Sequence, residues 1–159
     1  MGASGWDYVT PYTGSVEKSL DALHRQVFEE LYGDDDTFDC LDDLWAAEEF
    51  MGEEGTHSIL DIMRVVHSTA APSPSDVEDY GTLRPLAHDR LARHFGTDRP
   101  TPARFQELLD LGATVGQRPE PAETLIDECC MRWTGLYVLL YAGDEPEPTH
   151  VGIFGFSGD

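Results

Sequence analysis

Carboxylates are the side chains of this sequence with the clearest potential for chemistry, and many of them fall in one window. Positions 26–63 contain thirteen aspartates and glutamates and no lysine or arginine, in a chain with 31 acidic and ten basic residues. A dense acidic surface attracts a basic protein over long range and speeds its association. The window therefore predicts a docking surface for a basic protein partner. The residues expected to form it are Asp35, Asp36, Asp39, Asp42, Asp43, Glu49 and Glu53.

Two simpler explanations of the acidic window stay open at the level of sequence. The carboxylates could form a solvated face that has no partner. The helix dipole favours acids near a helix start, which accounts for Asp36 and Asp39 but not for Glu49 or Glu53. Alternatively, the protein could come from a salt-adapted proteome, but acids should then be spread evenly along the chain.

Metal-binding and catalytic patterns are weak in this sequence. A calcium-binding EF-hand loop needs glycine at its sixth position and glutamate at its twelfth, and counting from Asp34 these positions hold Asp39 and Trp45. His57 and Asp61 would share a face of a helix, where they could bind a metal or pair as a base and its orienting carboxylate. A surface hydrogen bond is the simpler explanation. We predict no catalytic residue, no metal and no cofactor.

The three cysteines indicate a cytoplasmic protein, and the overall charge limits its partners. Cys40, Cys129 and Cys130 are odd in number and two are adjacent, which makes a poor disulfide framework. Cys129 and Cys130 also lack the spacing of a zinc or redox motif, so we expect them in the core. No signal peptide or membrane-spanning run is evident. The net charge of −21 opposes direct binding to nucleic acid or to an anionic membrane.

The elements that must position these residues follow from the spacing of apolar side chains. Positions 6–10 are aromatic and β-branched and predict a short strand before Pro11. Ser15 is placed to cap a helix over 16–31, whose apolar residues recur at helical spacing, and Gly33 is placed to end it.

The acidic window itself predicts a second helix, capped by Asp36 or Thr37 and continuing through Met51. This helix would carry the acidic residues along one side. Thr56 could cap a third element over positions 57–67, whose apolar pattern fits a helix and a buried strand almost equally, with helix slightly favoured.

The middle of the chain predicts loops and short helices. Residues 68–79 are rich in proline and serine and predict a loop. Helices are expected over 85–95, closed by Gly96, and over 102–111, where proline occupies the first position. A further helix is expected over 121–130.

The end of the chain gives the strongest strand signal. Positions 133–141 and 149–156 are rich in aromatic and β-branched residues, and a turn at 143–148 separates them. Both faces of each strand are apolar, so we expect the hairpin to be covered on both sides. The residues expected to be buried are Tyr137, Leu139, Val151, Ile153 and Phe154. The whole pattern predicts one α+β domain over 1–159, with several short helices packed on a small antiparallel sheet that includes this C-terminal hairpin.

In size, acidity and lack of catalytic motifs, the chain is similar to immunity proteins that neutralise bacterial toxins. The resemblance is one of class, and it carries no residue across. It favours an intracellular acidic protein that inhibits or escorts a basic partner such as a toxin or nuclease. A DNA mimic is one alternative, because acids a helical turn apart approach the spacing of phosphates. The other is a small enzyme or ligand-binding protein, which a deep pocket holding a histidine beside a carboxylate would favour.

Overall fold

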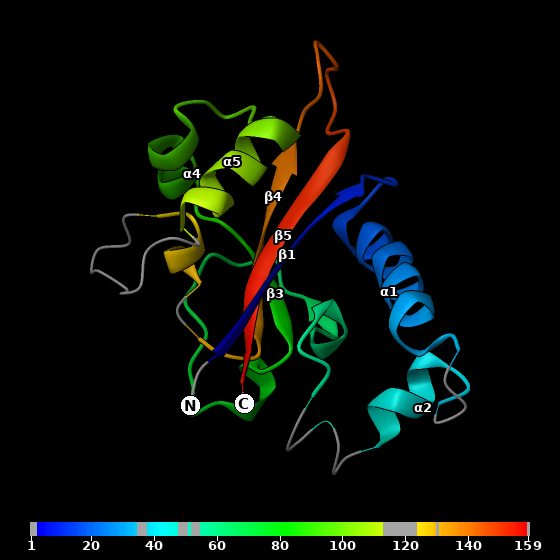
Figure 1. The fold of residues 1–159 in the computed structure, drawn as a ribbon. Coiled ribbons are helices and arrows are strands. Elements are labelled where there is room, and N and C mark those ends of the chain that lie inside the picture. The colour runs from blue at the N-terminus through cyan, green and yellow to red at the C-terminus, as the bar shows by residue number, and fades with distance from the viewer. Residues whose placement is uncertain are drawn as a thin grey trace.

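One five-stranded sheet organises the chain, with strands in the order β1-β5-β4-β3-β2 (Figure 1). The structure is a computed structural model that describes residues 3–34, 38–47, 51, 55–112, 124–129 and 131–158. The strands are β1 (Ala3–Pro11), β2 (Arg64–Val65), β3 (Thr82–Pro85), β4 (Thr134–Leu140) and β5 (His150–Gly158). The α-helices of these segments are α1 (Val16–Tyr32), α2 (Leu41–Ala46), α4 (His88–Phe95) and α5 (Pro102–Gly112). Short 3-10 helices are η1 (Ile59–Asp61), η2 (Val77–Asp79) and η3 (Ile126–Glu128).

The sheet is mixed. β5 lies between β4 and β1 and is antiparallel to both, whereas β2, β3 and β4 run parallel. The predicted α+β domain with a C-terminal hairpin is confirmed, but the expected antiparallel sheet also contains a parallel part. β2 has two residues and β3 has four, including Arg84 and Pro85, so neither is long enough to show an alternating pattern.

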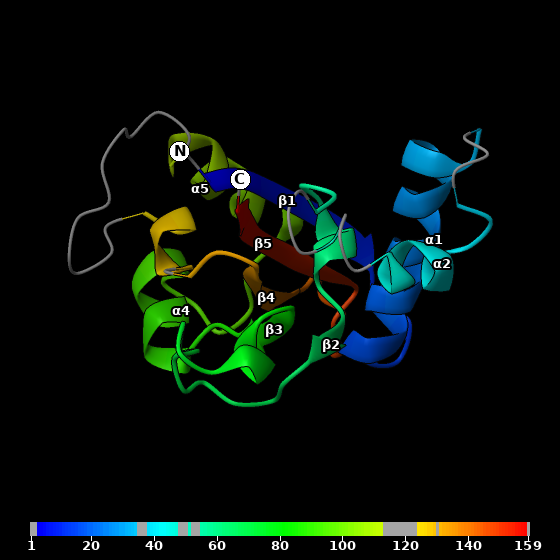
Figure 2. The same cartoon turned by 90° about the horizontal axis from the view of Figure 1, so that it is seen from below.

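Both faces of the hairpin are covered, as its apolar pattern predicts. Val151 and Ile153 of β5 belong to the core that contains α1, and Phe154 belongs to the core that contains α5. Figure 2 shows α1 and α4 on opposite sides of the strands. Tyr137 is also buried, whereas Leu139 is only half-buried. Alternate residues of the hairpin therefore serve two separate cores.

Two glycines of β5 let aromatic rings lie directly on the sheet. A Cβ at Gly152 would lie 2.7 Å from Cε2 of Phe105, and one at Gly155 would lie 2.6 Å from Cη2 of Trp6. Phe105 and Trp6 pack on opposite faces. Glycine at both positions is therefore explained by the close approach of these rings.

The first strand and first helix also form as predicted. β1 contains the predicted positions 6–10 and extends by residues at both ends. The side chain of Ser15 accepts a hydrogen bond from the backbone N–H of Lys18, and Gly33 follows the last turn of α1. Val16, Leu20, Leu23 and Val27 of α1 are buried.

The helix predicted across the acidic window is wrong in its extent. α2 begins after Cys40 and ends at Ala46, whereas Asp36 and Thr37 lie outside the described residues. The helix favoured for 57–67 is also wrong. Ser58 caps the single turn of η1, and the chain then extends into β2, which pairs with β3 instead of continuing a helix.

The later elements match the predictions more closely. α5 is confirmed, and Gly96 ends α4 in the left-handed conformation at φ 70°. α4 starts only at His88, because Pro85 ends β3. In the segment 121–130, the described residues 124–129 contain η3 and no α-helix, and the rest lies outside the described part.

Candidate functional site

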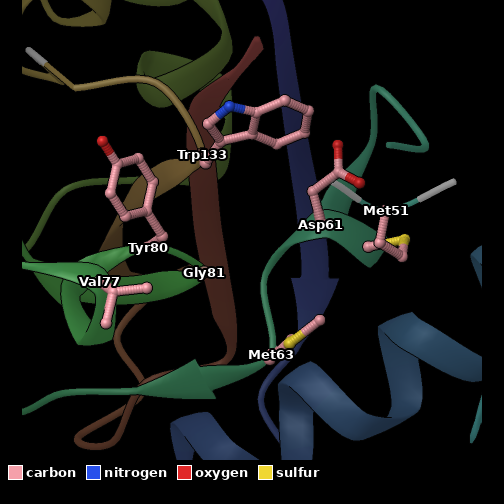
Figure 3. A pocket seen from close by; sticks show the side chains of 7 residues that line it. All are labelled: Met51, Asp61, Met63, Val77, Tyr80, Gly81 and Trp133. Atoms are coloured by element: carbon pink, nitrogen blue, oxygen red, sulfur yellow. The ribbon is translucent and has the colours of Figure 1, made fainter. Parts of the chain in front are cut away.

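An apolar cleft of about 440 Å³ lies where the amino ends of β2, β3 and β4 meet η1. Its lining residues come from segments far apart in the sequence and are Met51, Asp61, Met63, Val77, Tyr80, Gly81 and Trp133. Figure 3 shows Tyr80 and Val77 on one side of the cleft and Asp61 and Met51 on the other, with Trp133 at one end and Met63 at the opposite end. This end of the sheet thus carries a hollow bounded by methionine thioethers and aromatic rings.

The rim of this cleft exposes unusually large apolar side chains. In the described segments, five large apolar residues are substantially exposed, and three of them line the cleft. These are Met63 at 47%, Val77 at 82% and Tyr80 at 40% exposure. Single exposed apolar residues are common, but a group around one hollow indicates a binding surface.

A buried carboxylate forms part of the inner wall. Asp61 is only 4% exposed, and its Oδ1 accepts hydrogen bonds from the Thr56 backbone N–H at 2.6 Å and the Thr56 hydroxyl at 2.9 Å. The Ser157 hydroxyl donates to Oδ2. Within the described part of the chain, no cation forms an ion pair with Asp61. The carboxylate is fixed by neutral donors, so its charge is not neutralised by a partner there.

Trp133 is held beside Asp61 by its own backbone and by Gly55. The residue has a positive φ of 63°, which is uncommon for a bulky side chain and marks local strain. Its N–H donates to the Phe156 carbonyl and its carbonyl accepts from Gly81 N–H, both at 2.7 Å. A Cβ at Gly55 would lie 2.7 Å from Cη2 of Trp133 and 3.0 Å from Oδ1 of Asp61. Glycine at this position therefore lets the indole ring approach the carboxylate.

The predicted relation between His57 and Asp61 is wrong, because it depended on a helix that does not form. His57 is exposed at a positive φ of 52°, before η1 begins. Asp61 instead points inward, where Thr56 and Ser157 bind it.

The structure describes part of the predicted acidic docking surface. Asp39, Asp42 and Asp43 are exposed, at or just before the start of α2. Asp35, Asp36, Glu49 and Glu53 lie outside the described residues. Because α2 ends at Ala46, the described helix is too short to carry the expected long acidic row.

A separate hollow of about 330 Å³ between α1 and α2 contains His24, Asp21, Asp42 and Cys40. Burial lowers the pKa of His24, against the opposing effect of hydrogen bonds to the Ile62 and Ile59 carbonyls. The Nε2 atom of this imidazole is buried and has no hydrogen-bond partner in the described structure. Burial therefore favours the neutral form of His24.

No group of three potential metal-binding side chains occurs within the ranges that the structure describes. Cys129 is buried as expected, and its thiol lies 3.4 Å from the Thr134 carbonyl oxygen. Cys130 falls outside the described residues. The thiol of Cys129 is thus packed inside the protein.

No family model, curated protein or solved structure matches this chain. The helices of the described segments lack the length and apolar character needed to cross a membrane. The case for a function therefore depends on the geometry of the chain itself.

Sequence reasoning did not identify the cleft residues as a group. Val77 falls near the end of the loop that the sequence predicts over 68–79, and Tyr80 falls just beyond it. Trp133 falls in the strand predicted over 133–141. Large apolar side chains in an otherwise polar loop were the available signal. Their convergence depends on β2 and β3, which are too short to predict.

Proposed function

We propose that the chain is an acidic binding protein whose apolar cleft receives an arginine or lysine side chain of a basic protein partner. The observation that carries the proposal is the exposed rim of Met63, Val77 and Tyr80 around the buried, cation-free carboxylate of Asp61. A long aliphatic stem suits the rim, and a terminal cation suits the carboxylate. Such a partner would be inhibited or escorted by the complex.

The aromatic rings of the cleft support a cationic occupant. Cations are attracted to the faces of tryptophan and tyrosine by about 0.5–2 kcal/mol, depending on solvent exposure. Trp133 and Tyr80 supply two such rings, and Gly55 allows the first to lie beside Asp61. Methionine adds a polarizable and adaptable surface for the aliphatic stem.

The charge of the whole molecule supports the same class of partner. The net charge of −21 attracts a basic protein, and the exposed Asp39, Asp42 and Asp43 belong to the same acidic window as Asp61. Peripheral charges of this kind act mainly on the association rate, whereas a buried contact acts on the dissociation rate. We therefore assign attraction to the acidic surface and retention to the cleft.

The test is a titration with an arginine tripeptide blocked at both ends, followed through the Trp133 indole signal in an NMR spectrum. Met63→Ser should weaken binding because it removes apolar rim surface. Leu31→Ser is the matched control, because Leu31 is similarly exposed at 52% but does not line the cleft. An indole signal that does not respond, or equal loss of binding in both variants, would contradict the proposal.

A further inference from the structure

Another cavity, of about 190 Å³, lies at the opposite end of β3, where this strand leads into α4. Arg84, Ala87, Arg90 and Glu128 form part of its lining. β3 runs parallel to β2 and β4, so the cavity lies at the carboxyl end of a parallel strand. Helices that follow such strands present their amino ends there, and anionic ligands bind at these junctions.

Arg84 brings a buried guanidinium to the cavity wall. The residue is 8% exposed, and its Nη1 and Nη2 donate to the Ala70 carbonyl at 3.1 Å and to Asp79 Oδ1 at 2.8 Å. Its Nε is buried with no acceptor among the residues that the structure describes. A buried donor without an acceptor costs about 1–3 kcal/mol. This guanidinium therefore has hydrogen-bonding capacity that the protein leaves unused.

The start of α4 adds further donors. Ala87 is the N-cap residue, and its methyl side chain cannot accept a hydrogen bond from the first turn. The amino end of a helix carries free N–H groups and a partial positive charge. Since Ala87 also lines the cavity, an anion there would take the place of the missing cap.

The charged groups around the cavity are largely paired with one another. Arg90 donates from Nε and Nη2 to Glu128 Oε1, at 2.7 and 2.6 Å, and His94 Nε2 lies 2.7 Å from the same oxygen. Asp79 is paired with Arg84, and Asp89 is the acidic residue of the first turn of α4. The carboxylates thus orient the guanidinium groups of Arg84 and Arg90 at the cavity wall.

The sequence around this junction also differs in charge from the rest of the chain. Residues 84–104 contain five of the ten basic residues and only two acidic ones. The basic residues are Arg84, Arg90, Arg93, Arg99 and Arg104. The chain is therefore locally basic around this junction, and two of these arginines, Arg84 and Arg90, line the cavity.

We propose that this cavity binds a tetrahedral oxyanion, as a phosphate ion or a phosphate monoester. Guanidinium groups from β3 and α4 and the N–H groups of the helix start approach from different elements, which suits a ligand with several acceptor oxygens. Arginine recognises phosphate through paired N–H donors, and such charge-assisted hydrogen bonds are about twice as strong as neutral ones. The site is independent of the cleft proposed for a cationic side chain.

The experiment measures binding of inorganic phosphate and of phosphoserine by calorimetry and by amide shifts at the start of α4, with chloride at equal ionic strength as the reference. Arg90→Gln should weaken phosphate binding about tenfold, because it removes a charged donor. Arg93→Gln on the same helix is the matched control, since Arg93 does not line the cavity.

A second variant, Ala87→Asp, tests the site without destabilising the fold. Aspartate at the N-cap should stabilise α4, yet its carboxylate would occupy the place of the anion and abolish binding. Tighter binding of phosphoserine would assign a monoester and tighter binding of phosphate the free ion, and both support the proposal. Absence of saturable binding, unchanged binding in Ala87→Asp, or equal losses in Arg90→Gln and Arg93→Gln would overturn it.

Discussion

At the scale of single residues, glycines in the strands and a buried histidine constrain how the core packs. Gly152 lies under the fully buried ring of Phe105. A Cβ added at Gly5, at the edge of the sheet, would lie 3.3 Å from Cε1 of Phe156. The two positions therefore tolerate a methyl group differently, although both are glycines in strands. The sequence could not show which ring packs on Gly152, because Phe105 is 47 positions away.

Gly152→Ala is expected to destabilise the protein by about 1–3 kcal/mol, because the new methyl group would overpack the site against Phe105. Gly5→Ala should cost much less, since the neighbouring ring is only half-buried and can give way. Urea denaturation of both variants measures the difference. Equal free energies of unfolding for the two would show that Phe105 does not constrain Gly152.

His24 gives a prediction for pH dependence. Burial lowers its pKa below the value of about 6.5 in the unfolded chain, so the unfolded state binds more protons as the pH falls. The stability associated with neutral His24 is complete above about pH 6.5 and is lost as the pH falls from there towards the folded-state pKa. The free energy of unfolding of His24→Asn should therefore fall less than that of the parent between neutral and mildly acidic pH. Identical pH slopes would refute the assignment of a neutral buried imidazole.

At the scale of elements, the sequence predicts those with a long and regular pattern. α1, α5, β4 and β5 were all predictable, because seven or more residues repeat at one period or carry clear end signals. The short strands β2 and β3 could not be predicted, and nothing in the sequence indicated that α2 ends at Ala46. When a short apolar segment is buried on several sides, its apolar residues recur at no distinctive period. The pattern of residues 57–67 therefore favoured a helix, where η1 and β2 form instead.

The C-terminal hairpin should be essential for folding. β5 lies between β1 and β4 and pairs with both. Its residues Val151, Ile153 and Phe154 are fully buried. A chain that ends at Arg132 should lose cooperative unfolding, because both cores lose one wall. Thermal denaturation followed by near-UV circular dichroism measures this. A sharp transition close to that of the full chain would contradict the role assigned to the hairpin.

At the scale of the whole molecule, the fold separates two kinds of recognition. We propose cation binding at the acidic window and at the cleft by the amino ends of β2 and β3, and anion binding at the cavity by the carboxyl end of β3. The excess of acid was visible in the sequence, and it led correctly to exposed positions at Asp39, Asp42 and Asp43. The cleft was not visible, because its walls meet only through the tertiary fold.

The most direct test of a cation-binding cleft compares an arginine tripeptide with its citrulline analogue, which has nearly the same shape and no charge. Their affinities for the parent protein and for Asp61→Asn are measured by NMR titration at fixed salt, since screening alters every exposed charge. Asparagine can still accept from Thr56, and a thermal melt checks that the variant is folded. The parent should prefer arginine clearly, and Asp61→Asn should lose most of that preference while citrulline binding stays similar. The same preference for arginine in both proteins would contradict the account, because the attraction would then come from the acidic surface at large and not from the cleft.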